Sequence, residues 1–323
     1  MGKRRHGFTL IELMVVIAII AVLVTLAIGA TMRYITAQKE TNTRTIISSL
    51  DKALQKQWAK VIADAKAEPT ANISSAVLTL AGGDISRARV IWIKMRLMEA
   101  FPMTYAECNV ATNPLYTNNY IPVGIRKYIA SYQKKLAGGT PVLVNGIDTQ
   151  SAACLLMALS VNKVLDPDSI ASNLGQEVLA NGTYQNQFII DGWGSPVLFF
   201  RFPTPDLSTW SSLGGQDPQS NNPAKSTAAA SLADPVDPTG RLMDANWNNA
   251  ANYAAGGLVA QFEQICHAVH NSSGPFAWYI TPVIASAGSD RVAGLTANFS
   301  VSSPTNAGDN IYNYLLRFGA TGN

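Results

Sequence analysis

One carboxylate, that of Glu12, lies near the start of a long apolar segment. The segment covers residues 8–30, and its other 22 residues carry no charge. As a helix it would reach roughly 35 Å, which is enough to cross the hydrocarbon core of a bilayer. A carboxylate inside a membrane costs on the order of 2.5–3.5 kcal/mol. The sequence therefore predicts that a cationic partner neutralises Glu12 in the final assembly.

Basic residues at positions 3–5 precede this segment and predict that its N-terminal end lies on the cytoplasmic side of a membrane. Two simpler interpretations compete. The small residues Ala27 and Gly29 favour a secretory signal, but the apolar run is longer than the usual core of about 7–15 residues. A plain signal anchor explains the length and the basic flank, yet it gives no reason for Glu12.

The residues that end at Glu12 resemble a known processing site. Residues 7–12 read GFTLIE and lead into the apolar run, which resembles the motif of type IV pilins and type II secretion pseudopilins. The resemblance implies that a prepilin peptidase cuts between Gly7 and Phe8 and that the new N-terminus on Phe8 is methylated. It also implies a filament subunit with no enzymatic activity, which assembles with other pilin or pseudopilin subunits.

Cleavage there would create a cationic amine on Phe8, four residues before Glu12. In a staggered bundle of such helices, Glu12 of one subunit can pair with the Phe8 amine of its neighbour. Because a buried charge without a partner is strongly unfavourable, this pair would select one axial register. The expected location is the cytoplasmic membrane, crossed once with the head outside the cytoplasm, and then a periplasmic or cell-surface filament.

A loop near the C-terminus carries oxygen ligands on Ser286, Asp290, Asp309 and Asn310. It resembles the calcium-binding loop of major pseudopilins, which implies a structural calcium ion as the one possible cofactor. Calcium takes about six to eight oxygen ligands, which these side chains and nearby carbonyls could supply. Only two of the four are carboxylates, however, and the alternative is a set of Asx and Ser turns in an ordinary loop.

A second group of metal-ligating types comprises Glu263, Cys266, His267 and His270. Glu263, His267 and His270 are spaced by four and three residues, so these three could share one face of a predicted helix, where zinc could bind. Two histidines on an amphipathic helix are more often structural or solvent-facing, and we favour that interpretation.

The sequence contains no nucleophile elbow, phosphate loop or dinucleotide-binding fingerprint. The net charge is +3, but removal of the basic residues at 3–5 leaves 21 basic and 21 acidic residues. A neutral mature chain offers no electrostatic reason to expect a nucleic-acid partner. Cys108, Cys154 and Cys266 are too few for a disulfide framework, and which pair would bond in an exported protein stays open.

Beyond the membrane segment, residues 31–66 continue as a predicted amphipathic helix that ends before Pro69. Its apolar stripe is expected to lie on a globular head. The stripe consists of Ile46, Ile47, Leu50, Leu54, Trp58, Val61 and Ile62.

Residues 67–180 predict a mainly helical insertion. Its helix candidates are Ile85–Ala100, Tyr120–Leu136 and Thr149–Val161.

From residue 181 to residue 323 the pattern predicts an antiparallel sheet. Phe188–Ile190 and Val197–Phe202 flank the turn-forming residues 191–196, DGWGSP, and predict a hairpin. This turn also resembles one in major pseudopilins. Residues 203–256 are poor in aliphatic side chains and predict a long irregular surface excursion. A short helix over Leu258–His270 and further strands over 277–285 and 311–317 complete the predicted head.

The predicted fold class is α+β. A long N-terminal helix, with residues 1–7 as its leader, packs on a small antiparallel sheet of three to four strands with helical and irregular insertions. Two roles other than a filament subunit stay open. One is a minor or tip subunit whose head binds surfaces or takes up DNA, and the less favoured one is a membrane-tethered enzyme.

Overall fold

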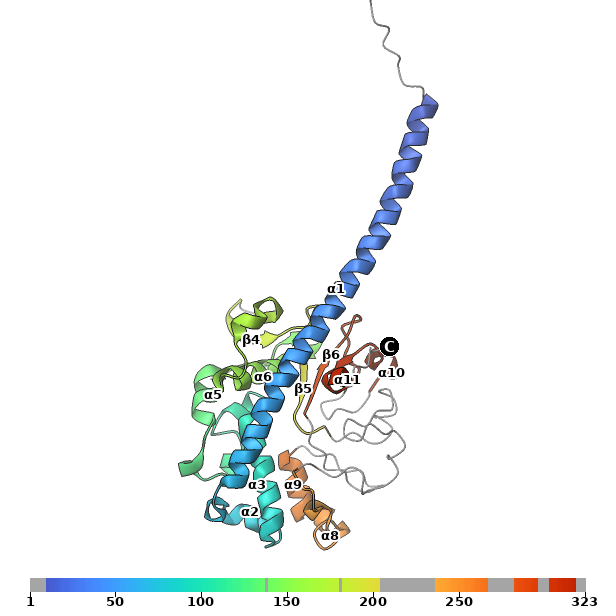
Figure 1. Cartoon of the computed structure of the whole chain (residues 1–323). Coiled ribbons are helices and arrows are strands. Elements are labelled where there is room, and N and C mark those ends of the chain that lie inside the picture. The colour runs from blue at the N-terminus through green and yellow to red at the C-terminus, as the bar shows by residue number, and fades with distance from the viewer. Residues whose placement is uncertain are drawn as a thin grey trace, which may run out of the picture.

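The computed structural model describes residues 10–136, 139–179, 182–203, 236–266, 282–295 and 302–317. One helix, α1 (Leu10–Ala67), projects from a head made of shorter helices and small antiparallel sheets. The predicted α+β class is confirmed. In Figure 1 the inner half of α1 lies across the head, and its outer half extends away from it.

The remaining helices and strands are short. The helices are α2 (Ser75–Leu80), α3 (Ile85–Ala100), α4 (Pro114–Thr117), α5 (Ile129–Leu136), α6 (Gln150–Val161), α8 (Ala250–Tyr253), α9 (Leu258–Cys266), α10 (Pro304–Ala307) and α11 (Asn313–Arg317). The strands are β1 (Leu143–Val144), β2 (Ile147–Asp148), β3 (Leu174–Val178), β4 (Tyr184–Ile189), β5 (Leu198–Phe200), β6 (Val283–Ser286) and β7 (Ile311–Tyr312). They form two antiparallel pairs, β1–β2 and β3–β4, and a three-stranded antiparallel sheet in the order β5-β6-β7.

The inner half of α1 buries the predicted apolar stripe against α3, α6 and the sheet of β6 and β7. Ile47, Leu50 and Leu54 are fully buried, and Ile62 at the end of the stripe is half-buried. Pairs three and four residues apart share one side of a helix, so the stripe forms a continuous contact. The head is therefore built around this half of α1.

The α1 helix is also tied to the C-terminal end of the described chain by Asp51. This carboxylate accepts hydrogen bonds from Arg317 Nε at 2.7 Å and Nη2 at 2.5 Å. Asn313 Nδ2 donates to Asp51 Oδ1 at 2.7 Å. Two elements that lie at opposite ends of the sequence thus meet in one charged contact.

The α3 helix follows the predicted range Ile85–Ala100, and its N-cap is Asp84. Nearly all of α3 is buried, including its charged side chains. Arg96 pairs with Glu99 at 2.5 Å and with Glu68 at 2.8 Å. Because buried charges are tolerated only when paired and hydrogen-bonded, these contacts let a charged helix pack in the core.

The other helix candidates of the insertion are partly confirmed. The α6 helix begins one residue after the predicted start. The candidate Tyr120–Leu136 is wrong over its first half, where a 3₁₀ turn over Val123–Ile125 follows Pro122 and α5 begins only at Ile129. Pro122 has no backbone N–H, and its ring holds φ at −59°. An α-helix therefore cannot continue through Pro122. The strands β1, β2 and β3 also lie in the region predicted to be mainly helical.

The predicted hairpin forms only at its turn. Ile190 and Pro196 make a single antiparallel bridge, and Asp191 N donates to Ser195 O at 2.9 Å. Beyond that bridge the two flanks separate, because β4 pairs with β3 and β5 pairs with β6. The turn also contacts α1, where Gly192 N donates to Thr43 Oγ1 at 2.9 Å. A Cβ at Gly192 would lie 2.3 Å from Lys39 O, so this close approach requires glycine.

The last predicted strand is also corrected. Only Ile311–Tyr312 is strand, and the chain then turns into α11. Asn313 explains the change, because its side-chain Oδ1 accepts the hydrogen bond from Ile284 N at 3.0 Å that a further strand residue would otherwise receive. Of the strand predicted over 277–285, only residues 282–285 are described, and β6 begins at Val283.

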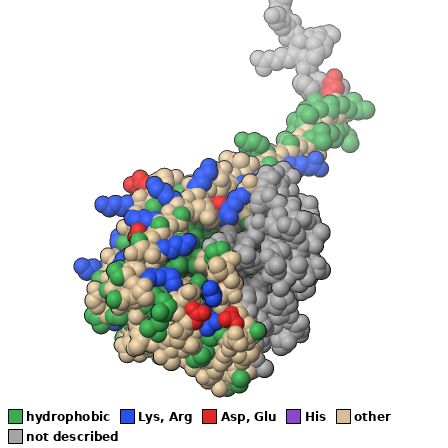
Figure 2. Space-filling view, turned by 60° about the horizontal axis from the view of Figure 1, so that its bottom comes forward, with side chains coloured by type: hydrophobic (Ala, Val, Ile, Leu, Met, Phe, Trp, Pro, Cys, Tyr) green, Lys and Arg blue, Asp and Glu red, His purple; other side chains and the backbone are tan. Residues whose placement is uncertain are grey.

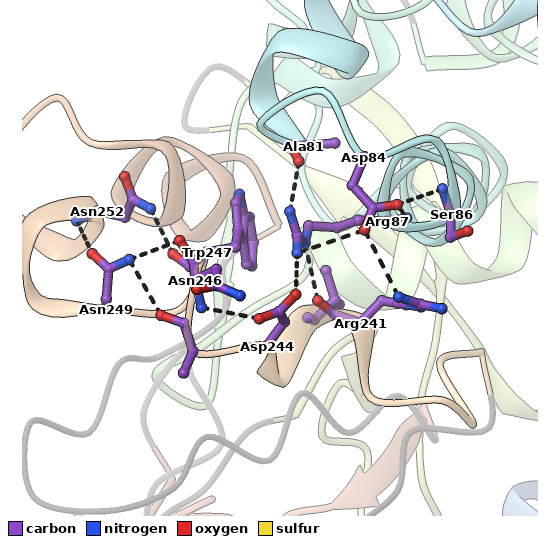
Figure 3. Close-up of polar contacts among 12 residues, drawn as sticks. Ala81, Asp84, Ser86, Arg87, Arg241, Asp244, Asn246, Trp247, Asn249 and Asn252 are labelled. Carbon is purple, nitrogen blue, oxygen red and sulfur yellow. Dashed lines mark hydrogen bonds and ion pairs between the residues drawn. The ribbon is translucent and has the colours of Figure 1, made fainter.

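Residues 236–256 belong to the predicted surface excursion and contain more structure than that prediction allowed. Residues 204–235 of the same excursion lie outside the described chain. Trp247 is buried and donates from Nε1 to Leu80 O at 2.9 Å. Arg87 lies over the Trp247 ring at 5.3 Å and donates to Asp244 at 2.9 Å (Figure 3). One tryptophan and one arginine thus fix a segment whose composition predicted no core contact.

We predict that truncating the α1 stripe destabilises the whole head. Leu50→Ala is expected to lower the free energy of unfolding by about 2–5 kcal/mol, because the fully buried side chain leaves a cavity. Denaturant titration of the full-length protein in detergent, followed by tryptophan fluorescence, measures this change. Lys52→Ala, on the exposed side of α1, is the matched control and should stay within about 0.5 kcal/mol of the parent. Equal effects of the two substitutions would contradict the packing described.

Candidate functional site

The outer half of α1 exposes its apolar side chains on every side. Residues 10–38 are all exposed, with Leu10 at 77% and Leu26 at 66%. Figure 2 shows hydrophobic side chains along this projecting part, in contrast to the mixed surface of the head. Soluble proteins rarely expose contiguous apolar patches larger than a few hundred Å², so such a surface marks a contact with a membrane or with other proteins.

The same segment meets the requirements of a membrane span. Within the described chain, α1 is the one helix long and apolar enough to cross a bilayer, and its most apolar stretch is not buried by the head. Two of its threonine hydroxyls are satisfied inside the helix. Thr25 donates to Val22 O and Thr31 donates to Ala27 O, each at 2.8 Å. Both hydroxyl groups therefore keep a hydrogen-bond acceptor when lipid surrounds the helix.

Glu12 lies in the first turn of α1 and is exposed. A carboxylate at a helix N-terminus is favoured by the helix dipole by about 0.3–1 kcal/mol. Gly7 and Phe8 precede the described chain, so the predicted cleavage between them and the predicted pairing of Glu12 with a Phe8 amine stay predictions. The structure places Glu12 at the outer end of the projecting half. The helix rises by about 1.5 Å for each residue between Glu12 and the head.

Comparison with protein families finds one match in this region. A model of the prokaryotic N-terminal methylation motif matches residues 2–28, which span the basic flank, Gly7, Phe8, Glu12 and most of the apolar run. Together with the long apolar helix, this match supports a type IV pilin-like prepilin. Searches of curated proteins and of solved structures find no match to the chain.

The loop that resembles a calcium site is held by one carboxylate. Asp309 Oδ2 accepts hydrogen bonds from Ser289 N at 2.7 Å, Ser289 Oγ at 2.8 Å and Asp290 N at 3.2 Å. The adjacent Asn310 donates from Nδ2 to Ala293 O at 2.6 Å. The structure thus brings Asp290, Asp309 and Asn310 into one loop, although residues 296–301 of that loop lie outside the described chain.

Ser286 has a different partner. Its hydroxyl donates to Asp191 Oδ2 at 2.6 Å and accepts from Gly288 N at 3.1 Å. Burial raises the pKa of Asp191, and the hydrogen bonds from Ser286 and from the backbone of Ser195 and Trp193 oppose that rise. Ser286 therefore connects the loop to the turn at 191–196, a role that the sequence did not indicate.

The chemistry of the remaining donors fits a calcium ion in part. Asp309 Oδ1 and Asn310 Oδ1 are buried and accept no hydrogen bond within the described chain. Both are hard oxygen atoms of the kind that calcium binds. Asp290 is exposed, and its Oδ1 accepts from Val292 N at 2.8 Å. Among the described residues no three His, Cys, Asp or Glu side chains gather at one place, so backbone carbonyls would have to complete the coordination.

The second metal candidate is only half described. Glu263 and Cys266 lie on α9, whereas His267 and His270 fall outside the described chain. Burial raises the pKa of the Cys266 thiol to about 12 and that of the Glu263 carboxyl to about 7. Zinc binds the thiolate, so a thiol held protonated by burial is a poor ligand.

We predict a pH dependence of stability that arises at Glu263. Its pKa is raised from 4.5 to about 7 in the folded protein, so the stabilisation from the protonated carboxyl is complete below about pH 4.5 and is lost as the pH rises through about 7. Glu263→Gln stays neutral and should melt near the parent's temperature at about pH 4 and above it at about pH 8. Thermal melts of the full-length protein measure this difference.

Asp168→Asn removes an exposed carboxylate elsewhere on the head and serves as the control. It should leave the pH profile unchanged. A Glu263→Gln profile parallel to that of the parent would contradict the prediction.

Proposed function

We propose that this protein is a structural subunit of a type IV pilus-like or type II secretion pseudopilus filament. The observation that carries the proposal is the continuity of α1. A methylation motif at residues 2–28 leads into a fully exposed apolar half, and the same helix then becomes the central element of the head. Such a helix joins a membrane segment to a folded domain without any linker.

In the proposed pathway the apolar half of α1 is first covered by lipid. The basic residues at 3–5 hold the N-terminal end on the cytoplasmic side, so the head lies outside the cytoplasm. Prepilin peptidase then cuts between Gly7 and Phe8 and methylates Phe8. In the filament, the apolar halves of neighbouring subunits replace lipid around one another.

Glu12 has a specific role in this exchange. Lipid tails and leucine side chains are about equally apolar, so the hydrophobic effect alone gives little preference for one helix stagger over another. A charge pair in the apolar bundle does give such a preference, because a register that leaves either charge alone is strongly penalised. We therefore assign the selection of register to Glu12 and the Phe8 amine of the neighbouring subunit.

We predict that Glu12→Ala separates processing from assembly. Intact-mass measurement of protein from native membranes should find both parent and variant starting at a methylated Phe8. Filament yield, measured by shearing and electron microscopy, should fall at least about tenfold, since the loss of one buried pair costs more than 1.4 kcal/mol per contact.

A substitution at the processing site is expected to act before assembly. Gly7→Arg should leave the seven-residue leader attached and block filaments at the earlier step. Parent-like filament yield from Glu12→Ala would contradict the assigned role, and a parent chain that begins anywhere other than Phe8 would contradict the prepilin mechanism.

We further propose that the loop formed by residues 286–295 and 302–310 binds a structural calcium ion. The support comes from the two buried acceptor oxygens on Asp309 and Asn310 and from the sequence resemblance. The other oxygen of Asp309 already holds Ser289 and Asp290 in place. A cation bound at Oδ1 would therefore lock the loop against the sheet of β6 and β7.

We predict that calcium raises the melting temperature of the protein through Asp309. At a free calcium concentration about 100-fold above the dissociation constant, binding adds about 2.7 kcal/mol, which corresponds to roughly 5–10 °C. Asp309→Asn should lose most of this difference between calcium and chelator, whereas Asp168→Asn should keep it. A parent melting temperature that does not respond to chelator would contradict the calcium site.

A further inference from the structure

Two of the three cysteines face each other inside the head. Cys108 ends a 3₁₀ turn, Ala106–Cys108, and Cys154 lies in α6. Their sulfur atoms are 3.9 Å apart, and both side chains are buried. The two residues are separated by 46 positions in the sequence, so the fold itself brings them together.

The backbone on both sides of this contact is held by one buried carboxylate. The hydroxyl groups of Tyr105 and Thr149 both donate to Glu177 Oε1, and Asn186 Nδ2 donates to Oε2 at 3.0 Å. In addition, Tyr105 N donates to the side chain of Gln150 at 3.2 Å. The segments that carry the two thiols are therefore fixed close to each other by hydrogen bonds that do not involve sulfur.

We propose that Cys108 and Cys154 form a disulfide in the native protein and that Cys266 remains a free thiol. The sulfurs must approach by about 2 Å to reach the bond length of about 2.05 Å. Each thiol loses one proton and one electron, and the sulfurs bond to each other. The electrons and protons pass to the disulfide of a thiol oxidoreductase outside the cytoplasm, which becomes a dithiol.

A surface pocket lies next to one of the two thiols. The pocket has a volume of about 240 Å³, and Cys108 forms part of its wall together with Tyr105, Asn109 and Thr112. In the proposed oxidation the oxidant first forms a mixed disulfide with Cys108, and Cys154 then displaces it.

The remaining cysteine is placed differently. Cys266 lies on α9, which packs against α2, α3 and α8. Sequence spacing alone left three possible pairings open, and the contact between Cys108 and Cys154 selects one of them. The inference that the head lies in an oxidising compartment rests on the proposed function. The choice of Cys108 and Cys154 as the pair rests on the structure.

Mass spectrometry of the full-length protein tests the proposal directly. Protein extracted from its native membrane in detergent is alkylated with iodoacetamide before any reduction and then digested. The expected result is a peptide pair linked through Cys108 and Cys154, with Cys266 alkylated. Three alkylated cysteines, or a link to Cys266, would overturn the proposal. Correct processing and filaments in the same cells would show that this failure leaves the proposed function intact.

Thermal melts of cysteine variants give a second test. Reductant should lower the melting temperature of the parent and of Cys266→Ser by about 5 °C or more, because reduction releases a constraint on the unfolded chain. Cys108→Ser and Cys154→Ser should not respond to reductant. A parent protein that melts at the same temperature with and without reductant would also overturn the proposal.

Discussion

The structure depends on one constraint, which is that a single helix must satisfy two different surroundings. The inner half of α1 buries Leu50, Leu54 and their neighbours in the head, while residues 10–38 expose apolar side chains that no other described part of the chain covers. Burial of apolar surface stabilises by about 25 cal/mol per Å², so an exposed apolar half-helix will not persist in water. Lipid or other copies of the same segment must cover it. The methylation motif at its start fits both environments, because the proposed pathway places processing in the membrane and assembly after it.

Where the two halves of α1 meet, the head contacts the helix through the turn at residues 191–196. Gly192 N donates to Thr43 Oγ1, and the space beside Lys39 O admits no larger residue. Asp191, next to it, accepts from Ser286 at the end of β6, and so links the turn to the predicted calcium loop. Farther along α1, Asp51 binds Arg317 and Asn313 of α11. The sheet of β5, β6 and β7 is thus attached to α1 at both ends, so that a force on the projecting half would pass directly into the sheet.

Much of this arrangement could be predicted from local patterns, and the failures have physical causes. The α3 helix has the bounds that its sequence predicted, and the α1 stripe follows from its period, because both signals are local. Non-local contacts could not be predicted. Asn313 ends a strand through its side chain, Trp247 donates a hydrogen bond to Leu80 O, and the flanks of the 191–196 turn separate into different sheets.

The candidate sites show the same division between local signals and non-local contacts. The sequence identified Glu12 from an unusual charge in an apolar run, but it assigned Ser286 to the metal loop without indicating its bond to Asp191. The sequence likewise could not show which two of the three cysteines lie close enough to form a pair.

The buried charges of the head have a related explanation. Arg201 is fully buried and pairs with Glu107 at 2.7 Å while it donates to Phe101 O at the same distance. Such a pair contributes little net stability, because desolvation offsets its attraction, yet it permits only one relative placement of the segments that carry it. The same reasoning applies to Arg96 with Glu68 and, in the proposed filament, to Glu12 with a neighbouring amine. Apolar contacts supply most of the stability in both places, in the core of the head and in the proposed bundle of α1 helices. Paired charges then determine which of the many apolar packings is adopted, so the specificity of the fold and that of the assembly have the same physical origin.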